Sequence, residues 1–157
     1  MIIIDGYNLL WSIQRESESF GPVGDVQLCR IVDRYLELSN EKGEIIFDGT
    51  GPPDKSGFDN LKKLEVVFAG RSSDADTMIE DKIAESTAPR RLTVVSSDRR
   101  VRKAARGRKV MVEKCEVFWG NVQKQLSRKK IQEPAGKRDG LSESETEQWL
   151  KFFGLEQ

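Results

Sequence analysis

Residues 1–8 read Met-Ile-Ile-Ile-Asp-Gly-Tyr-Asn, an apolar run that stops at an acid. Three β-branched residues in succession are typical of a strand buried on both faces in a parallel sheet. Gly6 permits a sharp exit from such a strand. Because ligand crevices in open α/β sheets lie at the carboxyl ends of the strands, we expect Asp5 and Asn8 to line one. A carboxylate so near a buried strand costs free energy unless a cation or a hydrogen-bond donor compensates it.

The alternation of strand and helix continues along the chain. Further strands are predicted at residues 44–47, 64–70, 91–98 and 109–112. An amphipathic helix is predicted from residue 25, and further helices from about residue 74, at 99–106 (a short basic helix) and at 115–126. Residues 9–24 are predicted to be irregular, with Trp11 and Phe20 as anchors. This order predicts an α/β protein in which helices cover both faces of a central parallel sheet.

The composition limits the chemistry open to this chain. Its 157 residues suit a single core, its formal net charge is zero, and it has two cysteines and no histidine. The lack of histidine excludes Ser-His and Cys-His nucleophile pairs and histidine-ligated metals. Two isolated cysteines predict reduced thiols. There is no apolar run of membrane-spanning length and no signal-peptide pattern, so we expect a cytoplasmic protein that does not bind membranes.

Acidic side chains gather where the predicted strands end. They are Asp5, Asp48 and Asp98 after three strands, and Asp74, Asp76 and Glu80 at a helix start. In a parallel sheet these positions share one edge, where clustered carboxylates repel one another unless a cation is present. Hard divalent ions such as Mg²⁺ or Mn²⁺ prefer oxygen ligands, and they promote phosphodiester hydrolysis. The pattern therefore favours a magnesium or manganese site, with Asn8 orienting a ligand.

Each acid alone also has a structural interpretation. Asp74 or Asp76 can cap a helix and favour its dipole. Asp48 and Asp98 can be turn acids that accept hydrogen bonds from nearby backbone amides. Asp5 is the hardest to explain in this way, because a turn acid needs no buried apolar strand before it. We therefore favour the metal site for the set as a whole.

A basic run follows the last of these acids. It comprises Arg99, Arg100, Arg102, Lys103, Arg106, Arg108 and Lys109, and Arg71, Lys62 and Lys63 are expected to extend it. Such a run is often only a solvated helix face. Its place beside the acids favours a surface that follows the RNA phosphate backbone. Tyr7 and Trp11 are candidates for stacking on RNA bases, with core packing as the alternative.

Four stretches together resemble a known family. They are Ile-Ile-Asp-Gly-Tyr-Asn-Leu-Leu at 3–10, Ile-Ile-Phe-Asp-Gly at 45–49, Val-Val-Phe-Ala-Gly with Ala-Asp-Thr-Met-Ile-Glu at 66–70 and 75–80, and Val-Val-Ser-Ser-Asp at 94–98. This series resembles the NYN domain in its YacP-like group, which are PIN-like bacterial ribonucleases. The resemblance covers about residues 1–126, and the C-terminal tail is similar to an extension that some members have.

The resemblance implies a PIN-like three-layer α/β/α fold and a metal-dependent endoribonuclease that cleaves single-stranded RNA, in a messenger or ribosomal context. The implied catalytic residues are Asp5, Asn8, Asp48, Asp76 and Asp98; the acids of this set would bind Mg²⁺ or Mn²⁺, with Asp74 as an extra ligand. The implied RNA-binding residues are Arg71, Arg99, Arg100, Arg102, Lys103 and Arg106. Glu80 matches the family pattern, with pairing to the basic run as the alternative.

The remaining expectations concern the tail and rival functions. Residues 127–140 are predicted to be a polar linker, and residues 141–157 a short helix that docks in cis or in a homodimer. The rival from another class is an RNA-binding or adaptor module of the same fold with little or no turnover. A phosphatase of the haloacid dehalogenase type is disfavoured, because the Asp-x-Asp-x-Thr pattern does not follow the first strand.

Overall fold

The computed structural model describes residues 1–16 and 24–132 and contains one sheet. Its strands are β1 (Ile2–Asp5), β2 (Gly43–Phe47), β3 (Leu64–Phe68), β4 (Thr93–Val95) and β5 (Met111–Glu113). Their order is β3-β2-β1-β4-β5, and every pairing is parallel. The first strand is therefore central, and Ile4 lies opposite both Ile45 and Val95. The predicted parallel α/β fold is confirmed.

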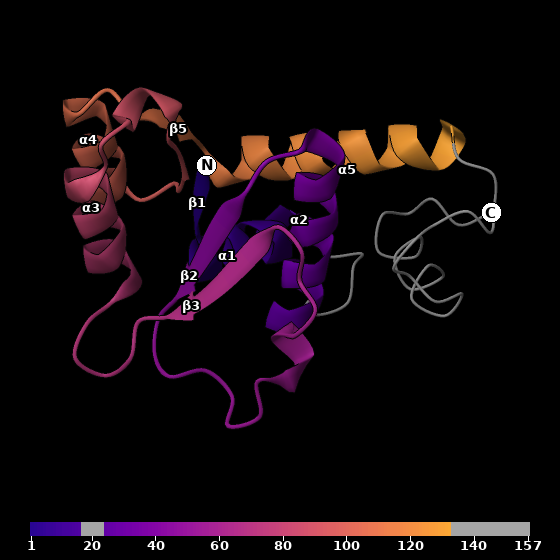
Figure 1. Cartoon of the computed structure of the whole chain (residues 1–157), viewed down its shortest axis with the longest axis horizontal. Helices are drawn as coiled ribbons and strands as arrows, with labels where there is room; N and C mark the ends of the chain where they lie inside the picture. The colour runs from indigo at the N-terminus through magenta and orange to yellow at the C-terminus, as the bar shows by residue number, and fades with distance from the viewer. Residues whose placement is uncertain (17–23, 133–157) are drawn as a thin grey trace.

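Helices cover both faces of the sheet. They are α1 (Gly6–Glu16), α2 (Asp25–Ser39), α3 (Ala75–Glu85), α4 (Arg99–Gly107) and α5 (Cys115–Gln132), with short 3-10 turns η1 (Ser56–Phe58) and η2 (Pro89–Arg91). Helices α1, α2 and α5 pack on one face, and α3 and α4 on the other. Figure 1 shows α3 and α4 together on one side of the sheet, with α2 on the opposite side. The result is the predicted three-layer α/β/α arrangement, with the sheet between two layers of helices.

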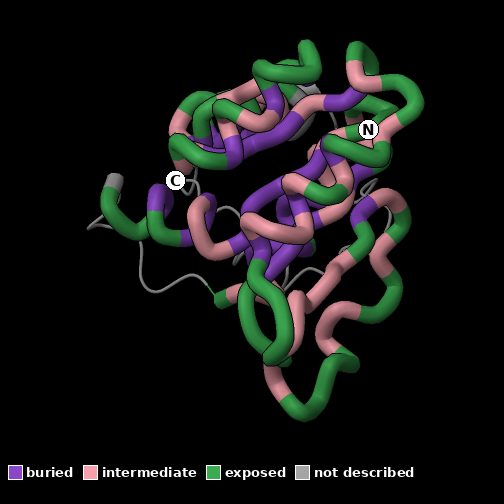
Figure 2. The backbone as a smooth tube through the Cα atoms, turned by 90° about the vertical axis from the view of Figure 1, so that its left-hand side faces the viewer, coloured by how far each residue is buried: buried purple, intermediate pink, exposed green. Residues whose placement is uncertain are grey.

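Two separate apolar clusters follow from the two-residue period of a strand. Ile4 joins the cluster beneath α1, α2 and α5, whereas its neighbour Ile3 joins the cluster beneath α3 and α4. Both side chains are buried, so the opening strand is apolar on both faces as its sequence predicts. The buried segments run through the middle of the molecule in Figure 2, and the exposed segments lie around them.

The prediction of an irregular segment at residues 9–24 is wrong for its first part. Helix α1 runs from Gly6 to Glu16, because Leu9, Leu10 and Ile13 recur at helical spacing and bury one face of the helix. Trp11 lies on the other side of α1, is 54% exposed, and is no anchor. Phe20 lies outside the described residues. The helix therefore begins directly after Asp5.

Gly6 is required by the close approach of a buried ring. A Cβ atom at this position would lie closer than 3.0 Å to the Phe47 ring, which is fully buried. The residue allows β1 to turn directly into α1 while Phe47 of the neighbouring strand packs beneath it. The spacing between the Asp5 carboxylate and the first turn of α1 thus depends on residue 6 being a glycine, which has no side chain.

The last helix is longer than predicted. Helix α5 continues to Gln132, so residues 127–132 are helical and do not belong to a linker. Residues 133–140 of the predicted linker and the predicted docking helix at 141–157 lie outside the described residues. Among the described helices, none combines the length and the apolar character needed to cross a membrane.

Candidate active site

Asp5 is a buried acid at the carboxyl end of the central strand. Only 5% of the residue is exposed. The Ser96 hydroxyl donates a hydrogen bond to Asp5 Oδ2 at 3.3 Å, and the Asn8 backbone amide donates a second. Burial, followed by the negative charges of Asp76 and Asp48, nevertheless raises the pKa of Asp5 from 3.8 to about 7. This carboxyl group therefore keeps its proton to a higher pH than an exposed aspartate does.

Asp76 is the nearest acidic partner of Asp5. It lies in the first turn of α3, and its side chain is within hydrogen-bonding distance of the Asp5 side chain. Partial burial, followed by the charge of Asp98, raises the pKa of Asp76, whereas the hydrogen bond with Asp5 opposes that rise. Two carboxyl groups at this separation either share a proton or require a compensating cation. The pair thus meets the electrostatic condition for binding a cation.

The other three predicted ligands hold backbone amides at the same edge. Asp48 Oδ1 accepts from the Ala75 amide at 2.7 Å, and Asp98 Oδ1 accepts from the amides at the start of α4. Asp74 caps α3 through the Thr77 amide at 2.7 Å and is exposed, and that bond lowers its pKa. These contacts match the structural interpretation of the acids. The backbone amides that donate to Asp48 and Asp98 contact only Oδ1 of each carboxylate. Each acid can therefore cap a helix start and still bind a cation through Oδ2.

Residues 1–16 and 24–132 contain no ready-made metal cage. No three acidic, cysteine or histidine side chains in this part of the chain converge closely enough to hold an ion. Mg²⁺ commonly binds through only one or two protein carboxylates and keeps several of its waters. The Asp5–Asp76 pair fits that mode, with Asp48 and Asp98 as outer carboxylates whose charges act on the pair.

The topology makes this edge favourable to anions. Helices α1, α3, α4 and α5 all begin just after a strand, so their amino-terminal ends lie at the carboxyl edge of the sheet. A helix N-terminus has a partial positive charge and orphan N–H groups, which stabilise carboxylates and phosphates. The edge can therefore hold several acids and also receive a phosphodiester.

Asn8 positions the loop after β4. Its Oδ1 accepts from the Ser97 backbone amide at 2.8 Å and from the Cys115 thiol at 3.1 Å. The asparagine thereby joins α1 to the β4–α4 loop and to the start of α5. Burial raises the pKa of Cys115 to about 11, so this thiol stays neutral and donates. Both cysteines are free and buried, in agreement with the prediction of reduced thiols.

Three residues of this edge were not predicted from the sequence. Ser96 is fully buried, donates to Asp5 and accepts from the Asp98 backbone amide at 3.1 Å. The Ser97 hydroxyl donates to the Glu116 carboxylate. The pKa of Glu116 is lowered first by a hydrogen bond from its own backbone amide and then by the one from Ser97. The serine pair is visible in the sequence before Asp98, but only the fold brings Glu116 to it.

The basic residues form one wall of a groove between α3 and α4. The groove has a volume of about 620 Å³ and is lined by Glu80, Arg100, Lys103, Ala104, Gly107 and Arg108. Arg100 forms an ion pair with Glu80 and donates to the Thr77 hydroxyl at 3.2 Å, so Glu80 pairs with the basic run. Arg108 donates to carbonyls at and just beyond the end of α3, including those of Ala84 at 2.9 Å and Ser86 at 3.1 Å.

The predicted RNA-binding residues differ in exposure. Arg71, Arg99, Lys103 and Arg106 are exposed, and Arg100 is exposed although paired. Arg102 is half-buried, and within the described part of the chain its Nε atom is enclosed without a hydrogen-bond partner. The exposed members are accessible to phosphates, whereas part of the Arg102 side chain is enclosed by the protein.

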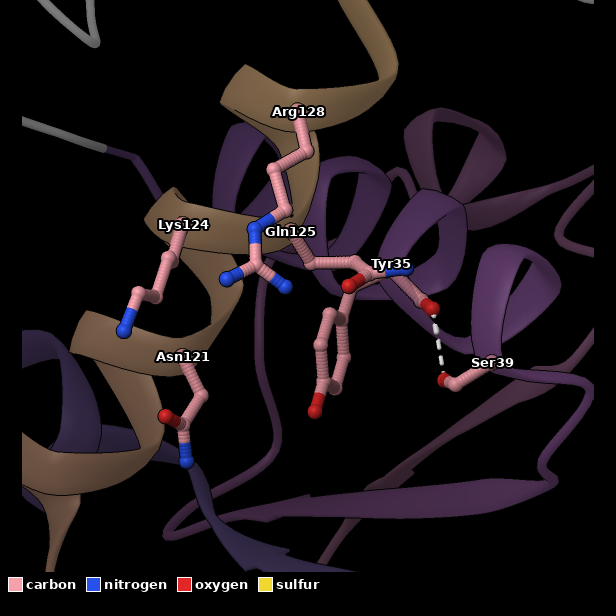
Figure 3. Close-up of a pocket in the computed structure, with 6 residues that line it drawn as sticks. All are labelled: Tyr35, Ser39, Asn121, Lys124, Gln125 and Arg128. Atoms are coloured by element: carbon pink, nitrogen blue, oxygen red, sulfur yellow. Dashed lines mark hydrogen bonds between the residues drawn. The ribbon is translucent and has the colours of Figure 1, made fainter.

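A second cationic hollow lies between α2 and α5. It has a volume of about 350 Å³ and is lined by Tyr35, Ser39, Asn121, Lys124, Gln125 and Arg128. Figure 3 shows Arg128 and Tyr35 extending into the same space. Arg128 lies about 20 Å along α5 from Cys115, at 1.5 Å per residue. This hollow is therefore remote from Asp5 and is useful as a control surface.

The fold and this edge define a class of protein, an α/β/α domain of the PIN-like type with an acidic carboxyl edge. The family model for the YacP-like NYN domain matches residues 2–153, and the chain belongs to that family. The family has a PIN-like ribonuclease fold, as the four sequence stretches indicate.

Solved structures agree with this assignment. The crystal structure of Rae1 (YacP) from Bacillus subtilis is similar with a TM-score of 0.68 at 19% identity, over 84% of this chain and 78% of that one. Its W164L mutant gives a TM-score of 0.63 at 19% identity, over 97% and 91%. At such identity the likeness concerns the fold alone. No curated protein matches this chain.

Proposed function

We propose that this protein is a metal-dependent endoribonuclease that hydrolyses single-stranded RNA at the acidic edge. One observation supports the proposal most strongly: the buried Asp5 carboxyl lies at hydrogen-bonding distance from Asp76, with its pKa raised to about 7. Placing a buried acid against a second, partly buried acid is unfavourable for stability alone, and such perturbed groups cluster at functional sites. Membership of the YacP-like NYN family favours nuclease chemistry over other uses of a cation.

Asp5 and Asp76 would hold Mg²⁺ or Mn²⁺, and Asp48 and Asp98 would act from the rim. A divalent cation supplies Lewis-acid chemistry, which activates water as the nucleophile and stabilises negative charge on the phosphate. Asn8 keeps the β4–α4 loop in place through the Ser97 amide, and so positions Asp98 relative to Asp5. Hydrolysis adds water across a P–O bond and leaves a phosphate monoester on one fragment and a hydroxyl on the other.

The basic groove would hold the RNA backbone on the side of the site formed by α3 and α4. Arg99 and Lys103 are exposed on α4, and Arg71 is exposed in the loop after β3. Lysine and arginine contacts to phosphates give affinity without sequence preference. The acids at the helix starts would then meet the scissile phosphate, while the cations hold its neighbours.

An RNA-binding module with little turnover is the second candidate. It is favoured by the amide contacts of Asp48, Asp74 and Asp98, and by the lack of a three-ligand cage among the described residues. In that case the acids would serve chiefly to stabilise helix starts, and the basic groove would be the functional surface.

Cleavage of a labelled single-stranded RNA separates the two candidates. The purified full chain is incubated with Mn²⁺, with Mg²⁺ and with EDTA, and Asp5→Asn is compared with Asp81→Asn. Asp81 is an exposed acid further along α3, so it controls for the loss of one negative charge. Metal-dependent cleavage that Asp5→Asn abolishes and Asp81→Asn retains supports the nuclease. RNA binding without cleavage under any condition supports the module.

A further inference from the structure

Helix α1 presents a large aromatic side chain to solvent beside the acidic edge. Trp11 is 54% exposed, whereas the apolar side chains on the opposite side of the helix are buried. An exposed indole gives up the free energy that its burial would provide. Packing of the described core therefore gives no reason for a tryptophan at this position.

The exposed indole is part of an ordered stack. The rings of Trp11 and Tyr7 are stacked, with centroids 6.2 Å apart and planes inclined at 20°. Tyr7 in turn meets the edge of the buried Phe47 ring at 5.0 Å. The tyrosine is thus fixed from below by the core, and it supports the tryptophan from one side. The indole therefore has one face of the stack already formed before another flat group meets it.

The stack lies close to the candidate catalytic acids. Tyr7 follows Asp5 by two residues, and Trp11 lies one helical turn further on the same face. Six residues of helix from Asp5 to Trp11 span about 9 Å. Arg15 is exposed another turn along, so a cation follows the two rings on this face. An aromatic stack followed by a cation matches a base and a nearby phosphate.

We propose that the Tyr7–Trp11 stack is a platform for an unpaired nucleobase, and that it holds single-stranded RNA on the α1 side of the acidic edge. This inference rests on the proposed function, since it names how that site grips its substrate. Bases in a duplex are already stacked on their neighbours, so such a platform selects single strands. It also grips the strand opposite the basic groove, because α1 and α4 lie on different faces of the sheet.

Binding measured without cleavage tests the platform. Fluorescence anisotropy of a labelled single-stranded RNA is recorded in EDTA for the full chain and for Trp11→Ala, Trp11→Phe and Met111→Ala. Met111 is an exposed apolar residue at the start of edge strand β5, away from the carboxyl edge, so it is the matched control. Loss of one base stack predicts affinity weaker by about tenfold for Trp11→Ala. Trp11→Phe should restore most of it, and Met111→Ala should bind as the parent does.

Two further readouts distinguish stacking from charge and from misfolding. The slope of log affinity against log salt should be the same for Trp11→Ala as for the parent, since no phosphate contact is removed. Binding of a blunt RNA duplex should not change. Thermal melting verifies that each variant is folded.

The outcomes separate this inference from the proposed function. If the parent binds and cleaves single-stranded RNA while Trp11→Ala binds it equally well, the platform is overturned and the nuclease stands. If the parent neither binds nor cleaves RNA, both fail. A loss of affinity in Trp11→Ala that Trp11→Phe does not restore also contradicts the proposal that a base stacks on Trp11.

Discussion

The carboxyl groups of Asp5 and Asp76 lie within hydrogen-bonding distance, although one ends the central strand and the other belongs to the first turn of α3. The fold makes this contact possible because β1 and β3 are parallel to β2 and end at the same edge. The backbone amide that opens α3 is itself fixed by Asp48 from the end of β2. Three neighbouring strands thereby determine the geometry of the acidic pair.

The stability of the metal-free protein should fall as the pH rises from about 4 to 7. The pKa of Asp5 is about 7 in the folded state against 3.8 ordinarily, so in this window the folded chain binds the proton that the unfolded chain releases. The free energy of unfolding should drop by up to about 4 kcal/mol over that range. Urea unfolding in EDTA at several pH values measures the drop. Asp5→Asn should make the free energy of unfolding nearly independent of pH in this range. If its dependence on pH is unchanged, other groups than Asp5 cause it.

Ser96→Ala should remove hydrogen bonds around Asp5 and lower the stability of the protein, which should still fold. The substitution removes the donor to Asp5 and the acceptor of the Asp98 amide, and leaves both groups short of a partner. We expect the free energy of unfolding to fall by about 1–3 kcal/mol. The pKa of Asp5 should rise further. Ser73→Ala, at an exposed serine before α3, is the control. Equal stability of the two variants would contradict this role for Ser96.

Gly6→Ala should destabilise the protein although alanine favours helices. The new methyl group would lie closer than 3.0 Å to the fully buried Phe47 ring, which is held in the core. Overpacking of this kind costs about 1–3 kcal/mol. Chemical denaturation of Gly6→Ala and of Gly120→Ala provides the comparison, since an added Cβ at Gly120 in α5 meets no atom within 4 Å. A Gly6→Ala protein as stable as the parent would show that Phe47 can yield.

Removing exposed cations from α4, where Lys103 lines the basic groove and Arg99 lies at the start of the helix, should lower RNA affinity in a salt-dependent manner. For Arg99→Ala or Lys103→Ala, the slope of log affinity against log salt should decrease by about 1 for each phosphate that the variant no longer neutralises. Lys124→Ala removes a lysine from the remote hollow between α2 and α5 and should leave the slope unchanged (Figure 3). The measurement is anisotropy of a labelled single-stranded RNA at several salt concentrations. Identical slopes for all three variants would remove the groove from the RNA-binding surface.

Much of the fold is predictable from the sequence because strand ends leave a strong pattern. Asp5 and Asp98 follow apolar strands, and the parallel arrangement inferred from the strand–helix alternation brings them to one edge. Asp76 is recognisable from its place at a helix start. The pairing of Asp76 with Asp5 is not predictable, since it depends on how β2 and β3 align beside β1.

Other features depend on information that periodicity does not contain. The start of α1 escapes prediction because its apolar stripe is short, and the exposed Trp11 resembles an anchor in the sequence alone. The capping role of Asp74 is predicted only as an alternative, because it depends on the extended backbone of that residue at φ −135°. The contact between Ser97 and Glu116 joins two segments that only the folded sheet brings together.

Binding of Mn²⁺ to the folded protein tests the central claim most directly. Isothermal titration at pH 7 compares the parent with Asp5→Asn, Asp76→Asn and the exposed control Asp81→Asn. We expect Mn²⁺ to bind the parent and the control, and to displace protons because the pKa of Asp5 is about 7 without metal. Both pair variants should lose this binding and the proton release. Equal Mn²⁺ binding by the parent and Asp5→Asn, or no binding by the parent, would contradict the assignment of the acidic pair as a metal site.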